Sequence, residues 1–424
     1  MTAKKVFFLK LVLATLLVIA FAASIFSSQY DVLLISLSVV CALGLFLEKG
    51  FILLAVVLGV YLIIGFAPIS LYRGEMKAET VSAYILFIFP FYLSILFLSW
   101  IRDRKVPSIS LAWGGRAETI FYAHMLVVWS GTVYVYVAYG NVFLNQDGRF
   151  FINPLVGYVV KSGLYAAIYV ACVRRLRSFK DFFVYVFLPI APTILIGSRG
   201  NVVAYVMAVG LYYFLISGRV SIKGYAKSVA VIMLVFFVVT GIFYLRRSGE
   251  GAFITVDELI YSYFHDDGYV SYILAPFHVA FRETIGLANR VITVGIVNEV
   301  TSYPLFVADM VTVLPGEQVA AGRALGEMMG VIGDGGLTPG LIGGIFLDYG
   351  HAGVIFAAVM LGLVLAFLRK LSTHSHYWLI VFCVTIAQFV HLFHRGFVKP
   401  EYFLSYLIIY LYYHLTAVRE VDKR

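Results

Sequence analysis

Residues 81–101 read VSAYILFIFPFYLSILFLSWI and contain no charged side chain. An α-helix needs about 20 apolar residues to cross the hydrocarbon core of a bilayer, so this stretch predicts a membrane-spanning helix. Backbone groups in lipid must be paired within the protein, and the alternating pattern of a membrane β-strand is missing here. The stretch therefore predicts an all-α fold, a bundle of transmembrane helices.

The composition extends this prediction to the whole chain of 424 residues. Hydrophobic residues make up 62% of it and charged residues 13%, against about 45–50% and about 25% in soluble proteins. A soluble enzyme, a disordered chain and a disulfide-rich secreted domain are thereby excluded. Cys41, Cys172 and Cys383 each lie in an apolar run, so we expect neither a disulfide nor thiol chemistry.

About twelve apolar runs are long enough to cross a bilayer when tilt is allowed for. They cover residues 6–26, 32–48, 51–70, 81–101, 119–139, 154–173, 182–198, 200–217, 228–245, 352–368, 377–393 and 401–418. Three regions result: transmembrane helices 1–9 in residues 1–246, a large loop in 247–351, and helices 10–12 with a tail in 352–424.

Basic residues indicate the orientation of these helices. With the N-terminus inside, clusters such as Arg102, Arg104 and Lys105 fall in cytoplasmic loops, as the positive-inside rule requires. Both termini are then cytoplasmic and the large loop is extracytoplasmic. The net charge of +9 is explained in this way, and nucleic-acid binding is not expected.

The large loop carries its own structural signals. Thr255 and Glu258 form a capping-box pattern ahead of an amphipathic run through residue 264, which predicts an interfacial helix. Residues 337–348 are apolar, and the charge distribution favours a short helix at or dipping into the outer face before one crossing at 352–368, over a thirteenth span. The glycine-rich stretch 330–344 predicts a turn followed by close helix packing rather than a phosphate loop, because no strand precedes it and no Gly-Lys-Ser/Thr follows.

Arginines gather on the face where the charge rule expects few. Arg199 and Arg395 lie in tight turns between apolar runs, and Arg282, Arg290 and Arg323 lie in the large loop. The planar guanidinium suits bidentate contacts with phosphate, although local carboxylates such as Glu283 could pair with these arginines instead. A polyprenyl pyrophosphate would place its charged head at this depth, so we predict that at least two of the arginines bind one.

Further candidates are titratable groups. Lys161 lies within an apolar run, where a charge is either a substrate contact or a snorkelling side chain. The favoured candidates for a proton-accepting base are clustered at His265, Asp266 and Asp267, and Glu283 and Asp334 are the other candidates. The alternative interpretation of Asp266 and Asp267 is a solvated pair of acids that ends a helix. No His/Cys/Glu spacing predicts a metal site.

Several short motifs resemble those of the O-antigen and oligosaccharide repeat-unit polymerases of the Wzy type. They are Arg199 followed by Gly210, the turn Gly197-Ser-Arg-Gly200, Thr338-Pro339 with Phe346-Leu-Asp-Tyr-Gly350, and Arg395-Gly396. The arrangement of about twelve spans with one large late loop is similar too. Ten residues separate Arg199 from Gly210 in the first of these motifs. A second copy of this spacing is not clean, because Asp334 stands where Arg323 would require a glycine, with glycines at 333 and 335.

The resemblance implies a GT-C-like, inverting glycosyltransferase of the bacterial inner membrane with its active face in the periplasm. Donor and acceptor would both be undecaprenyl-pyrophosphate-linked oligosaccharides, with no nucleotide sugar, metal or other cofactor. Arg199 and Arg395 would stabilise the leaving pyrophosphate, and a chain-length-regulating polysaccharide co-polymerase would be a partner.

Two other functions remain open at this stage. An O-antigen ligase, which transfers glycan to the lipid A core, has a similar layout, but its spaced histidine and serine are not evident near His265, His278 or His351. A flippase for lipid-linked oligosaccharides should carry charges at mid-depth, where Lys161 is the single exception.

Overall fold

The helices that could cross a membrane are the main elements of the computed structural model. It describes residues 12–13, 15–16, 30–46, 48–66, 74–98, 113, 115–143, 152–174, 178–217, 241, 256–264, 269–296, 303–313, 320–330 and 336–416. Five helices in these ranges are long and apolar enough to span: α4 (Ala78–Leu98), α5 (Arg116–Tyr139), α6 (Pro154–Val173), α15 (Gly340–Leu371) and α16 (His376–Arg395). Shorter apolar stretches lie in α2 (Tyr30–Phe46), α3 (Ile52–Phe66) and α9 (Arg199–Ser217), and α17 covers Pro400–Thr416.

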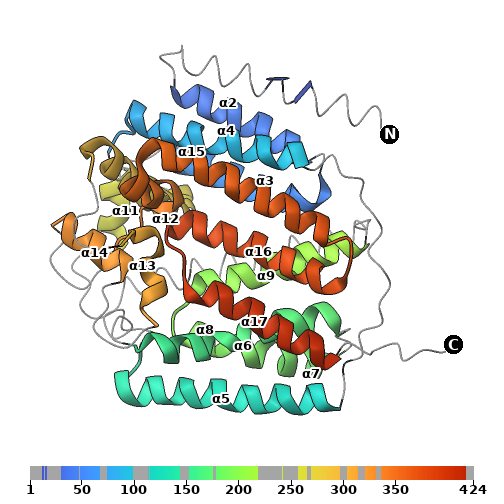
Figure 1. The fold of residues 1–424 in the computed structure, drawn as a ribbon. Coiled ribbons are helices and arrows are strands. Elements are labelled where there is room, and N and C mark those ends of the chain that lie inside the picture. Colours follow the sequence, from blue (N-terminus) through green and yellow to red (C-terminus); the bar gives the residue numbers. More distant parts are fainter. Residues whose placement is uncertain are drawn as a thin grey trace. The chain divides into compact units, whose positions relative to one another are not determined.

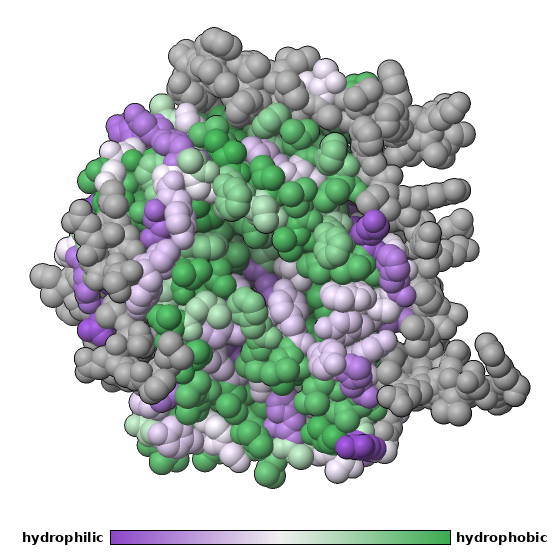
Figure 2. Space-filling model, in the orientation of Figure 1, coloured by the Kyte–Doolittle hydropathy of each residue, from purple (hydrophilic) through white to green (hydrophobic). Residues whose placement is uncertain are grey.

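The prediction of an all-helical fold is thus confirmed, since every element in the described ranges is a helix, and five of them have the length and composition to cross a membrane. Figure 2 shows hydrophobic side chains over much of the visible face, as expected for helices that meet lipid. The number of twelve spans stays a prediction. The predicted spans at 6–26 and 228–245 lie almost entirely outside the described residues.

The predicted span at 182–198 begins and ends earlier than expected. It consists of α7 (Phe179–Phe182), a π-helical turn at Phe183–Phe187 and α8 (Leu188–Leu195). Pro192 has no N–H to give to the carbonyl of Leu188, and Nε1 of Trp129 donates to that oxygen at 3.1 Å instead. A side chain from α5 thereby satisfies a backbone group that proline leaves unpaired.

α15 is divided by a kink at Gly350, whose φ of 59° and ψ of −157° lie outside the helical region. The sequence predicts a short helix at 337–348 and a separate crossing at 352–368, and the structure has this division. Residues 340–345 are buried, whereas much of the helix after the kink is exposed, with Phe356 at 67%. The first half therefore packs within the protein, and the second half has the exposed apolar side chains of a helix in lipid.

The helices form two compact units. Unit 1 contains Met1–Arg102, Phe236–Lys370 and Phe389–Val398, and unit 2 contains Asp103–Val235, Leu371–Gln388 and Lys399–Arg424. In unit 2, α6 packs against α5, α8, α9 and α17. In unit 1, α2 packs against α3 and α4, and α3 and α4 also contact one helix of the predicted large loop, Tyr269–Val294.

That loop is largely helical where the structure describes it. α11 (Val256–Phe264) confirms the predicted amphipathic helix, while Thr255 lies outside the described residues. α12 (Tyr269–Val294) is a long helix that the sequence patterns did not reveal, and it packs on α3 and α4. α13 (Leu305–Val311) and α14 (Ala321–Met328) complete the region (Figure 1).

Candidate functional site

Three glycines bring the start of α15 against the end of α16. A Cβ on Gly344 would lie 2.6 Å from the carbonyl oxygen of Gly396, and one on Gly396 would lie 2.5 Å from that of Gly340. Gly396 also has a φ of +93°, which favours glycine. We call this arrangement of Gly340, Gly344 and Gly396 the glycine contact. It confirms that the glycine-rich stretch ends in close helix packing.

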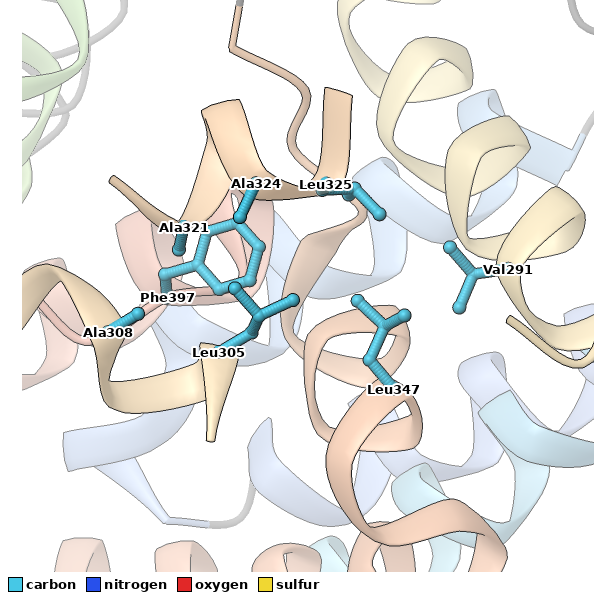
Figure 3. Packing of buried hydrophobic residues seen from close by; sticks show 8 residues of the cluster. All are labelled: Val291, Leu305, Ala308, Ala321, Ala324, Leu325, Leu347 and Phe397. Atoms are coloured by element: carbon cyan, nitrogen blue, oxygen red, sulfur yellow. The ribbon is translucent and has the colours of Figure 1, made fainter. Parts of the chain in front are cut away.

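A hydrophobic cluster supports the glycine contact from one side. Phe397, directly after it, packs with buried residues of four helices, as Figure 3 shows. The other members are Val291, Leu305, Ala308, Ala321, Ala324, Leu325 and Leu347. Asp348 accepts hydrogen bonds from the backbone N–H groups of Leu305 and Phe306, at 2.9 and 2.7 Å, and so caps α13. Val398 N–H donates to the carbonyl of Phe306 at 2.9 Å.

Arg395 is held at this junction by its neighbour Gly396. Its side chain is partly buried, and it has neither a carboxylate nor another hydrogen-bond partner among the described residues. It lies close enough to Tyr61 and His394 for its charge to act on both. A partly buried guanidinium without a counter-ion is suited to an anionic ligand.

His394 is a polar residue of this site that the sequence patterns did not single out. Its Nδ1 lies 3.2 Å from Oγ1 of Thr284 and 3.4 Å from the hydroxyl of Tyr61. A Cβ on Gly340 would lie 2.6 Å from Cγ2 of Thr284. Four helices therefore meet at His394: α3, α12, α15 and α16. In the sequence, the one signal for His394 as a site residue was its position beside Arg395.

Arg282 is fully engaged by the chain itself. Its side chain is 3% exposed, and the guanidinium donates to the carbonyls of Gly65 and Gly74 at 3.0 and 2.5 Å. One turn away, Nδ1 of His278 lies 3.1 Å from the carbonyl of Ile64, and burial lowers the pKa of His278 to about 4. Side chains on this face of α12 thus contact backbone carbonyls at and after the end of α3, and we assign them a structural role.

A second face of α12 carries Glu283 and Arg290. They are seven residues apart (290 − 283), which is about two helical turns, so they share a face. Arg290 is exposed and has no carboxylate partner among the residues described. Glu283 is partly buried, and the loss of solvent raises its pKa to about 7.

Glu283 should make the stability of the protein fall with rising pH. Because its pKa in the folded state lies above the ordinary value of 4.5, its contribution is fully present below about pH 4.5 and is lost as the pH rises through about 7. Glu283→Gln should flatten this fall, by about 1–3 kcal/mol in unfolding free energy, since one pKa unit corresponds to about 1.4 kcal/mol. Melting temperatures between pH 4.5 and 8 check it. Glu327→Gln, on an exposed carboxylate, is the control, and an unchanged slope in Glu283→Gln contradicts the expectation.

Of the remaining predicted residues, Arg323 lies on α14, Lys161 and Arg199 belong to unit 2, and four lie outside the described residues. Nε of Arg323 lies 3.5 Å from Oε1 of Glu327 in an exposed pair, whose contribution to stability is small. His265, Asp266, Asp267 and Asp334 lie outside the described residues.

Two predicted residues belong to unit 2. Arg199 begins α9 directly after a tight turn, where Ser198 N–H donates to the carbonyl of Thr193 at 3.0 Å. Nζ of Lys161 lies 2.6 Å from Oε2 of Glu401, whose side chain is 1% exposed. Lys161 is thus neutralised by a buried partner that lies at the first turn of α17.

Comparison with known protein families, curated proteins and solved structures found no match. Within the described ranges, no three His, Cys, Asp or Glu residues are grouped so that they could hold a metal ion.

Proposed function

We propose that the chain is a membrane glycosyltransferase that polymerises undecaprenyl-pyrophosphate-linked oligosaccharide repeat units on the periplasmic face of the bacterial inner membrane. The observation that carries this proposal is the partly buried Arg395, which has no counter-ion among the described residues and is fixed by the glycine contact. An anionic headgroup at the membrane boundary is the ligand that such a cation suits.

The positions of the motifs that resemble the polymerase family give this proposal further support. Arg395-Gly396 and the stretch that begins at Thr338-Pro339 are far apart in the sequence, yet they meet at the glycine contact. Asp348 of the Phe346–Gly350 motif caps α13 beside it. The motifs at 338–350 and 395–396 therefore build one local structure, whereas the motifs around Arg199 belong to unit 2.

The proposed reaction follows from these groups. A hydroxyl of the acceptor sugar attacks the anomeric carbon of the donor, the bond from that carbon to the pyrophosphate oxygen breaks, and undecaprenyl pyrophosphate leaves. Arg395 stabilises the charge that develops on the leaving oxygen. Glu283 is the proposed base that takes the hydroxyl proton, because it adjoins Thr284, which contacts His394, and its pKa of about 7 suits that role.

The flippase alternative is less well supported. It needs accessible charges at mid-depth, and Lys161, which was the single candidate, pairs with buried Glu401. A ligase would need the same anion site, so only the product distinguishes it from a polymerase.

A deletion strain tests the proposed function. Deletion of the gene should reduce the surface glycan to single repeat units attached to the lipid core. Reintroducing the intact gene should restore the long glycans. Loss of all surface glycan with intact lipid-linked polymer would identify a ligase. Lipid-linked units that accumulate in the cytoplasm would identify a transporter.

The proposed topology has both termini in the cytoplasm. A reporter that is active only in the periplasm should therefore be inactive when fused after Ser372 or after Lys423, because basic residues flank both positions. A fusion after Gly140, in a loop predicted to be periplasmic, should be active and serves as the control. Activity after both Ser372 and Lys423 would reverse the last three spans.

A further inference from the structure

His394 presents one ring nitrogen to the protein and the other to accessible space. Nδ1 contacts Thr284 and Tyr61, whereas Nε2 has no hydrogen-bond partner among the described residues. Among the described residues, the enclosed side-chain polar atoms that lack a hydrogen bond do not include Nε2 of His394. The ring is partly buried and packs edge-on against Tyr61, with the ring centroids 6.0 Å apart.

Both hydroxyls can donate to Nδ1 of His394, and such a hydrogen bond places the ring proton on Nε2. Tyr61 is 3% exposed, and its hydroxyl has two partners within reach, Thr284 and, at 3.4 Å, Nδ1 of His394. Thr284 can donate to the carbonyl of Ala280 at 3.4 Å or to Nδ1. With Nδ1 as an acceptor, a neutral imidazole carries its single proton on Nε2.

We propose that Nε2–H of His394 donates a hydrogen bond to the same pyrophosphate that Arg395 binds, with Tyr61 and Thr284 as positioning residues that fix the tautomer. The inference rests on the proposed function and adds a second ligand to its anion site. Arg395 supplies charge, and His394 supplies a directional donor from the preceding residue. A pyrophosphate has enough oxygen atoms to accept from both.

The glycine contact explains why the pair of donors is held in place. The would-be Cβ of Gly340 approaches the carbonyl of Phe393 at 3.1 Å and that of His394 at 3.9 Å, so the last turn of α16 lies directly against the start of α15.

Paired amide substitutions separate the proposed role from a purely structural one. In His394→Gln the side-chain amide reaches the place of Nε2, and in His394→Asn it reaches only the place of Nδ1. Titration of the purified full chain with inorganic pyrophosphate should show near-normal affinity for His394→Gln. Affinity for His394→Asn should fall by roughly 10- to 100-fold, the effect of losing one hydrogen bond to a charged group. If His394 acts only through its contacts with Thr284 and Tyr61, His394→Asn, whose amide reaches the place of Nδ1, should bind pyrophosphate more tightly than His394→Gln.

The positioning residues provide the second measurement. Thr284→Val combined with Tyr61→Phe removes both hydroxyls, so it should weaken pyrophosphate binding when His394 is present. The same two changes should leave the affinity of His394→Gln unchanged, because an amide has no tautomer to fix. Thr284→Ser keeps its hydroxyl and is the matched control. Melting temperatures without pyrophosphate establish that each variant is folded.

The outcomes distinguish this inference from the proposed function. Loss of binding in Arg395→Ala with full binding in folded His394→Asn overturns the role of His394 alone. Equal losses in His394→Gln and His394→Asn overturn it as well. Unchanged pyrophosphate binding in Arg395→Ala overturns the anion site, and the proposed function with it.

Discussion

Replacing Arg395 with alanine should slow polymer extension by about 10²–10³-fold while the protein stays folded, as expected for the loss of one preorganised donor. The side chain has no carboxylate partner among the described residues, so its removal leaves no buried charge unpaired there. Arg395→Lys retains the charge but not the planar fork, and it should recover only part of the rate. The rate of chain growth by purified protein and the melting temperature are measured in one preparation.

Arg323→Ala is the matched control for this prediction. It removes an arginine of the same region that is exposed and already paired with Glu327. The loss of such a pair changes stability by about 0.3–0.5 kcal/mol and should leave the rate unchanged. Near-normal polymer length in folded Arg395→Ala, or an equal loss in Arg323→Ala, would remove Arg395 from the active site.

Gly396→Ala and Gly344→Ala should each abolish activity by pushing α15 away from the end of α16. The added methyl groups would overlap carbonyl oxygens at 2.5 and 2.6 Å, and such overpacking costs about 1–3 kcal/mol. Gly396→Ala should be the worse of the two, because its φ of +93° adds about 1–2 kcal/mol of strain. Chemical unfolding in detergent, together with the rate of polymer extension, measures both effects.

Gly59→Ala in α3 provides the contrast. No atom lies within 4 Å of its would-be Cβ, and alanine is favoured over glycine in a helix by about 0.5–1 kcal/mol. This variant should be as stable as the unaltered protein or more so, with full activity. If Gly344→Ala and Gly396→Ala behave like Gly59→Ala, the glycine contact does not position the site.

Patterns with a strong local cause were predicted well. The apolar runs gave the helical membrane fold, and the run 256–264 became α11. The glycines at 340–344 pack as expected, because small residues are required wherever backbones approach closely. The end of the span at 182–198 was misplaced, since the π-helical turn and the side-chain donor to Leu188 depend on neighbouring helices.

Features that depend on residues far apart in the chain could not be predicted from the sequence. α12 is amphipathic, but its buried face also carries Arg282 and Asn289, which bond to groups near the ends of α3 and α4, and it was missed. Glu401, the partner of Lys161, lies far along the chain. His394 likewise gains its meaning from Tyr61 and Thr284 on other helices. Such contacts appear only once the helices are packed.

The most direct test of the proposed function is chain growth by the purified protein in vesicles. It is supplied with undecaprenyl-pyrophosphate-linked repeat units as both donor and acceptor, in the presence of excess chelator. The proposed function predicts a ladder of lipid-linked glycans that lengthens with time, release of undecaprenyl pyrophosphate, and loss of both in Arg395→Ala. Failure of the folded protein to extend the units, or extension that requires added Mg²⁺ or Mn²⁺, would contradict it.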